Sequence, residues 1–95
     1  MSQTKLRPAV VLADAGRGDW ILCQITSKPY GDSRILEISD DSFADGSLQL
    51  TSYVRGSKLF TANADLIVSQ VGTLKRETFS QIIELVIGIL RESQA

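Results

Sequence analysis

The sequence contains no histidine and only one cysteine among its 95 residues. Histidine is the commonest metal ligand and the side chain that titrates nearest neutral pH, so its absence argues against a metalloenzyme and against histidine-based acid–base catalysis. The single cysteine, Cys23, excludes an intrachain disulfide and favours a reducing cytoplasmic environment. Because Cys23 lies in an apolar run, we expect it to be an inert packing residue.

The net charge is also small, and long apolar runs are absent. The net charge of −1 argues against a broad basic surface for duplex nucleic acid, although it leaves room for a local basic patch. No stretch approaches the ~20 apolar residues that span a bilayer, and no signal-peptide pattern is present. We therefore expect a soluble, intracellular protein with a single domain over residues 1–95.

The N-terminal half reads as short strands. Pro8 suits a strand start, and residues 9–13 (AVVLA) are apolar enough for a strand with both faces covered. The glycine-containing segment 13–19 predicts a turn into a second strand at 19–27, so the two strands form an antiparallel hairpin. A third strand is expected at 34–38.

The middle of the chain continues this pattern. Residues 39–46 (SDDSFADG) suit a single helical turn. Residues 47–62 predict two short strands broken near Gly56, and residues 64–72 (ADLIVSQVG) predict a further strand. Strands at this spacing favour a small barrel or sandwich.

The last twenty residues change to a helical period. The apolar side chains fill about 200° of a helical wheel, which predicts a C-terminal amphipathic helix. That face is wider than one barrel usually needs, so either the helix packs deeply or part of it meets another subunit. Trp20 and Phe60 are expected in the core. The apolar helix positions are Phe79, Ile82, Ile83, Leu85, Val86, Ile87, Ile89 and Leu90.

Arg7 and Thr26 are the strongest candidates for chemistry. A hairpin sets the start of its first strand beside the end of its second, so these two residues should be neighbours. A guanidinium fork matches phosphate oxygens, and a hydroxyl next to it can donate to charge that grows in a transition state. Together the two side chains would suit binding and cleavage of a phosphodiester. The plainer alternative is that Arg7 forms a rim salt bridge to an aspartate of residues 39–46.

Several segments together resemble a known family. RPAVVLAD, CQITSK, SYVRGSKLFTA, LIVSQVGTL and the closing helix occur in the order and spacing of the PemK/MazF toxins of bacterial toxin–antitoxin pairs. The resemblance implies a mainly β fold, a small SH3-like β-barrel with a C-terminal α-helix, and usually a homodimer. It also implies a cognate antitoxin and metal-independent, cofactor-free cleavage of single-stranded RNA, often mRNA, with Arg7 and Thr26 as the central catalytic residues.

The implied reaction is attack of a ribose 2′-hydroxyl on the adjacent phosphorus, which gives a cyclic phosphate and a free 5′-hydroxyl. Arg7 would stabilise the phosphorane and Thr26 would donate a hydrogen bond to it. Because arginine stays protonated at any useful pH, Arg7 is not assigned as the general base.

Five further residues are candidates for RNA binding. Ser27 and Lys28 follow Thr26, although they also suit a solvated turn. Tyr30 could stack on an unpaired base or simply cover the barrel end. Arg55 and Lys58 lie where similar proteins place part of the RNA-binding wall, and the alternative is that they are edge-strand charges. Asp40 and Asp41 should point apart and so make a poor metal pair.

The chain departs from the family near its start. Family members usually have a further strand and loop ahead of the arginine–proline pair, whereas Met1 lies six residues before Arg7 here. An open strand edge invites pairing, so we expect residues 1–6 or a second subunit to cover it. Two alternatives to the nuclease remain: a catalytically degenerate toxin fold that acts as a protein-binding module, and, ranked last, a gyrase-poisoning toxin of the CcdB type.

Overall fold

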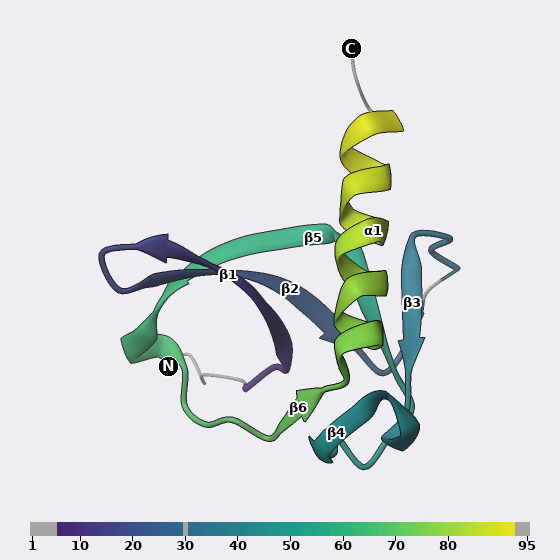
Figure 1. Ribbon diagram of the computed structural model, residues 1–95, viewed down its shortest axis with the longest axis horizontal. Helices are drawn as coiled ribbons and strands as arrows, with labels where there is room; N and C mark the ends of the chain where they lie inside the picture. Colours follow the sequence, from purple (N-terminus) through teal and green to yellow (C-terminus); the bar gives the residue numbers. More distant parts are fainter. Residues whose placement is uncertain (1–5, 30, 93–95) are drawn as a thin grey trace, which may run out of the picture.

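The computed structural model describes residues 6–29 and 31–92 and shows a mostly β protein with one C-terminal helix (Figure 1). Four strands form a curled antiparallel sheet in the order β1-β2-β5-β3, and a short second sheet pairs β4 with β6. The expected fold class is therefore confirmed, as an incompletely closed barrel. The strands are β1 (Ala9–Gly16), β2 (Asp19–Thr26), β3 (Ile35–Ile38), β4 (Phe43–Gly46), β5 (Ser52–Asn63) and β6 (Gly72–Leu74).

The expected hairpin is formed by β1 and β2. A two-residue turn, Arg17–Gly18, joins the strands, and both of its residues have positive φ, as a tight hairpin turn requires. The expectation that the first strand has both faces covered is wrong, because β1 lies at the edge of the described sheet and only Val10 in it is buried. Val11 is 42% exposed.

The expected break near Gly56 is also wrong, because β5 runs through it as one bent strand. The register with β2 shifts between Cys23 and Ile25, but β2 pairs with β5 on both sides of this shift, and the first residues of β5 also pair with β3 along the other edge. Gly56 lies at the bend, where a Cβ would come within 2.7 Å of Ile89 Cδ1. The glycine therefore allows close approach of the C-terminal helix.

The connecting segments are less regular than expected. The helical turn is present as η1 (Asp40–Ser42), where the amide of Ser39 donates to Ser42 Oγ at 3.1 Å, but it ends at Phe43, which begins β4. The expected strand at 64–72 is wrong. Its first residues form the helical turn η2 (Ala64–Leu66), and residues 67–71 lie in irregular chain before β6.

The C-terminal helix α1 (Arg76–Glu92) packs against one face of the sheet and confirms the helical prediction. Ile82 is fully buried in a cluster with Val54, Cys23 and Ile38. Each such side chain contributes about 1.5–3 kcal/mol by leaving water. Trp20 is half-buried, but Phe60 is 44% exposed, so its assignment to the core is wrong.

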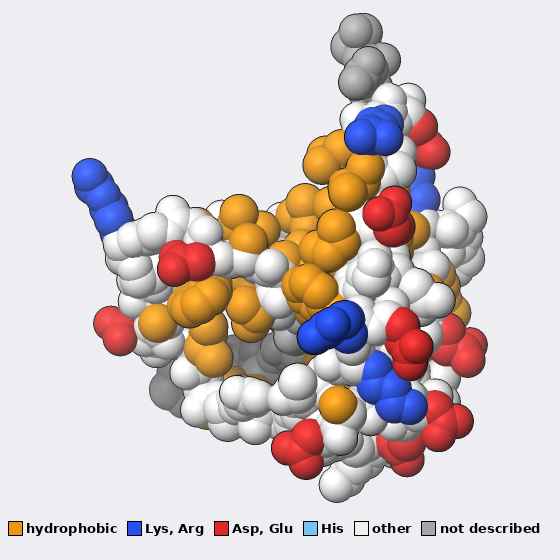
Figure 2. Space-filling model, viewed as in Figure 1, with side chains coloured by type: hydrophobic (Ala, Val, Ile, Leu, Met, Phe, Trp, Pro, Cys, Tyr) orange, Lys and Arg blue, Asp and Glu red, His pale blue; other side chains and the backbone are white. Residues whose placement is uncertain are grey.

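Hydrophobic side chains also gather in the hollow between the curled strands and α1 (Figure 2). Across the described residues, large apolar side chains are exposed on β1, β5, η2 and α1 and in the chain before β1, β5 and β6. They are Leu6, Val11, Leu50, Leu59, Phe60, Leu66, Ile67, Val68, Val71 and Leu90. In the part of the chain that is described, no helix is both long and apolar enough to cross a membrane.

Candidate functional site

The open end of the β1/β2 hairpin is the part of the structure that bears on the predicted Arg7 and Thr26 pair. Ala9 pairs with Gln24, and the Ile25 amide then donates to the Pro8 carbonyl at 3.2 Å. Continued by one residue on each strand, this register sets Arg7 opposite Thr26. The alternative of a rim salt bridge to residues 39–46 gains no support, because the ion pairs within the described residues involve Arg34 and Arg55. Arg7 is exposed.

The row of residues containing Thr26 lies on the outer face of the sheet. Thr26 pairs with Tyr53 of β5, which pairs in turn with Glu37 of β3. Ile25, which precedes Thr26, and Val54, which follows Tyr53, belong to the buried cluster. Because side chains alternate along a strand, Thr26, Tyr53 and Glu37 face away from that core. This row of three strands ends at Thr26, on the side of β2 that pairs with β1.

The Thr26 hydroxyl is already hydrogen-bonded. Its Oγ1 accepts from the Lys28 amide and donates to the Lys28 carbonyl, each at 3.2 Å. This local turn directs the chain out of β2, and it leaves Ser27 and Lys28 exposed beside the site. Tyr30, the candidate stacking residue, lies outside the described residues.

Arg55 is on the same outer face but is not a solvated edge charge. It follows Val54 and pairs with Ile35, and its side chain is only 20% exposed. Its Nε lies 3.7 Å from Oδ2 of Asp32, an ion pair of two largely buried side chains. Nε has no hydrogen-bond partner within the described residues. Lys58, in contrast, is exposed on β5.

The sequence analysis did not identify Asp32 or Glu37 as neighbours of the site. Glu37 could have been found, because it lies in the expected third strand next to the apolar Ile38. Side chains alternate along a strand, so Glu37 faces away from the side that carries Ile38. Asp32 gave no comparable signal, because its position depends on how residues 27–34 fold back onto β5.

Cys23 lies behind the site in the core, as expected. Its Sγ donates to the Arg55 carbonyl at 2.9 Å. Burial raises the pKa of the Cys23 thiol to about 11, so the thiolate is scarce at neutral pH. Its full burial in the core cluster confirms the expectation that Cys23 is a packing residue.

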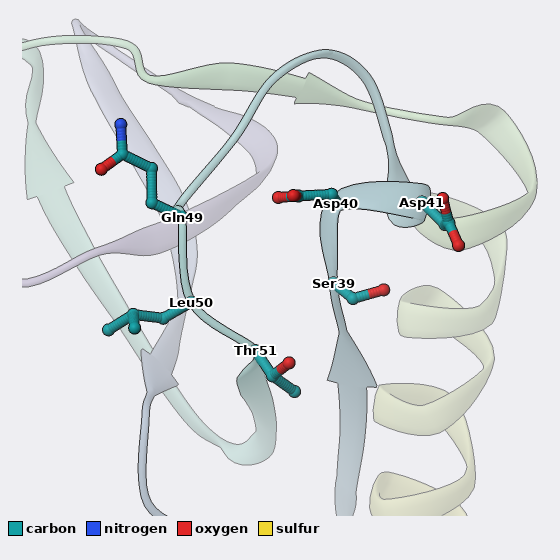
Figure 3. A pocket seen from close by; sticks show the side chains of 6 residues that line it. All are labelled: Ser39, Asp40, Asp41, Gln49, Leu50 and Thr51. Carbon is teal, nitrogen blue, oxygen red and sulfur yellow. The ribbon is translucent and has the colours of Figure 1, made fainter.

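A separate pocket of about 280 Å³ lies between η1 and the chain before β5 (Figure 3). Asp40 points across it and Asp41 points away from it, as expected for neighbours at the start of a helical turn. Asp40 also accepts a hydrogen bond from the Ser47 hydroxyl. Among the described residues, no three His, Cys, Asp or Glu side chains are grouped to hold a metal ion.

Comparisons with known proteins assign the fold and its family. The family model of PemK-like, MazF-like toxins of type II toxin–antitoxin systems matches residues 1–90, and the chain belongs to this family. No curated protein is similar enough in sequence to count as a match.

Three solved structures share the fold. An Mtb toxin is 17% identical in sequence, with a TM-score of 0.70. The aligned region covers 86% of this chain and 90% of the toxin chain. The Mycobacterium tuberculosis toxin MazF-mt6 has 18% identity and a TM-score of 0.72, covering 90% and 86%. An endoribonuclease from Mycobacterial species has 16% identity and a TM-score of 0.71, covering 94% and 84%.

Proposed function

We propose that this chain is an endoribonuclease toxin that cuts single-stranded RNA, including mRNA, without a metal ion. The observation that carries the proposal is the register of the β1/β2 hairpin, which, continued by one residue, places Arg7 opposite Thr26 at its open end. A solved structure with the same fold is named an endoribonuclease, which supports the assignment.

In the proposed reaction the ribose 2′-oxygen forms a bond to phosphorus and the bond from phosphorus to the 5′-oxygen breaks. The 2′-hydroxyl loses a proton to a base that is not assigned, and the leaving 5′-oxygen gains one. The products are a 2′,3′-cyclic phosphate and a 5′-hydroxyl. Arg7 holds the non-bridging oxygens, whose charge grows in the transition state.

Thr26 has a more specific part in this reaction than the sequence suggests. Its proton points to the Lys28 carbonyl in the free protein, at 3.2 Å. When a phosphate lies against Arg7, rotation of the hydroxyl redirects this proton to the phosphate while Oγ1 still accepts from the Lys28 amide. Ser27, Lys28, Tyr30, Arg55 and Lys58 remain proposed RNA contacts.

Two protein partners belong to the proposal. A second copy of the chain is proposed to cover the outer edge of β1, which is a strand edge of the described sheet. A cognate antitoxin is proposed to bind over the RNA site, with acidic side chains placed against Arg7. Both partners would act in the cytoplasm.

The alternative is a degenerate toxin fold that only binds protein. It is favoured by the bonded state of the Thr26 hydroxyl, which gives that residue a structural role in the turn to Lys28. Growth arrest on induction that disappears in Arg7→Ala supports the nuclease, whereas no toxicity of the unchanged chain supports the alternative.

The direct test is to sequence RNA ends after induced expression and to assay the purified chain with EDTA present. We expect fragments with cyclic phosphate and 5′-hydroxyl ends. An oligonucleotide spanning a mapped site, with 2′-deoxyribose at the scissile nucleotide, should resist cleavage. Its cleavage would exclude the mechanism.

A further inference from the structure

Asp32 is held firmly at the end of the loop that follows Thr26. Its amide donates to the Pro29 carbonyl at 3.0 Å, and its Oδ1 accepts from the Arg34 amide at 2.8 Å. Its second oxygen, Oδ2, faces Nε of Arg55 at 3.7 Å. Both carboxylate oxygens are therefore engaged, and the side chain has little freedom to move.

The main chain around Arg55 is fixed from two sides. The Gly56 amide donates to the Arg34 carbonyl at 3.1 Å, and the Arg55 carbonyl accepts from the Cys23 thiol at 2.9 Å. Asp32 adds a third constraint, on the guanidinium itself. At 3.7 Å the ion pair is an electrostatic contact rather than a hydrogen bond.

The terminal nitrogens of this guanidinium lie in a different environment from Nε. Nε is the only side-chain nitrogen or oxygen of the described residues that is both buried and without a hydrogen-bond partner. The terminal nitrogens form no hydrogen bond within the described residues, and they belong to the residue next to Val54 on the face that carries Tyr53 and Thr26. The guanidinium is planar and rigid. With its Nε set against the Asp32 carboxylate, its terminal nitrogens are therefore held in one orientation.

We propose that Asp32 is a positioning residue for RNA: it holds Arg55 so that the terminal nitrogens contact a phosphate next to the one bound at Arg7 and Thr26. This inference rests on the proposed nuclease function. It adds a second phosphate contact and names the residue that orients it.

The proposal makes a prediction opposite in sign to simple electrostatics. A carboxylate near bound RNA repels phosphate, so neutralising Asp32 should tighten binding if charge alone matters. If Asp32 orients Arg55, neutralising it releases the guanidinium and weakens binding. Asp32→Asn suits the test, because the amide oxygen still accepts from the Arg34 amide while the charge facing Arg55 is lost.

The experiment measures binding of an RNA oligonucleotide that spans a mapped cleavage site and carries 2′-deoxyribose at the scissile nucleotide. Fluorescence anisotropy across a salt series gives both the affinity and its salt dependence. We expect Asp32→Asn to weaken binding about tenfold, as for loss of one charged hydrogen bond. The plot of the logarithm of the binding constant against the logarithm of the salt concentration has a negative slope. Its magnitude should decrease by about 0.7, the value for one single-strand phosphate contact.

Matched variants separate orientation from stability and net charge. Arg55→Gln should give the same loss, and the double variant Asp32→Asn/Arg55→Gln no further loss. Asp32→Glu keeps the charge and should keep the slope. Asp41→Asn removes an equal charge at an exposed site on η1 and should weaken nothing. Thermal unfolding of each variant confirms that the assay observes folded protein.

An unchanged slope and equal or tighter binding by Asp32→Asn would overturn the inference, as would a slope unaffected by Arg55→Gln. If the unchanged chain neither cuts nor binds RNA, the proposed function itself fails. The two failures are distinguishable.

Discussion

Gly56 of β5 lies directly against Leu85 of α1, where an added Cβ would be only 2.8 Å from Leu85 Cγ. Gly56→Ala therefore forces the helix away from the sheet or forces Leu85 into a strained rotamer. We expect the free energy of unfolding to fall by about 1–3 kcal/mol, as for other overpacked cores. Urea denaturation measures this change.

The helix supplies a matched control for this substitution. A Cβ on Gly88 meets nothing within 4 Å, so Gly88→Ala changes only the helical propensity. We expect it to stabilise the fold by about 0.5–1 kcal/mol. Equal effects of the two substitutions would mean that α1 does not approach β5 as described.

The Thr26 hydroxyl is expected to serve both the turn and the reaction. Thr26→Val preserves shape but removes both bonds to Lys28. We expect cleavage to fall by about 10²-fold, the usual loss for one donor to a developing oxyanion, and Thr26→Ser to retain most activity. Full RNA cleavage by Thr26→Val would exclude the assigned role.

Cys23 should make the stability of the fold depend on alkaline pH. The thiol ionises near 9.0 when unfolded and about 11 when folded, so the unfolded chain loses its proton first. Between these values the wild-type free energy of unfolding should fall by about 2–3 kcal/mol relative to Cys23→Ala, since one pKa unit equals about 1.4 kcal/mol. Parallel pH profiles of the two proteins would show that the thiol is not buried.

The edge position of β1 predicts a dimer. A second copy paired along this strand would satisfy its outward main-chain groups and cover Val11, which is 42% exposed. Light scattering should report about twice the chain mass of 10.4 kDa. A monodisperse species of 10.4 kDa would contradict pairing between copies.

The strongest parts of the sequence prediction came from periodicity. The helical repeat located α1, and two neighbouring β-rich runs with a glycine turn located the hairpin. The antiparallel register of that hairpin is what the prediction of Arg7 beside Thr26 rests on, since no distant contact is needed for that step.

Long-range contacts account for what the sequence did not predict. Gly56 reads as a break, but its role depends on a helix some thirty residues later in the chain. Residues 64–72 have strand-like composition, yet Asn63 Oδ1 accepts from the Asp65 amide at 3.0 Å and starts a helical turn. The Asp32–Arg55 pair depends on the conformation of a loop, which local propensity does not determine.

The most direct measurement is cleavage of a defined single-stranded RNA by the purified chain and by Arg7→Ala, in EDTA, with analysis of the product ends. Arg7 is exposed, so its removal should leave the circular dichroism spectrum unchanged. We expect the unchanged chain to produce 2′,3′-cyclic phosphate and 5′-hydroxyl ends, and Arg7→Ala to cut at least 10²-fold more slowly. Equal cleavage by the two proteins would contradict the account.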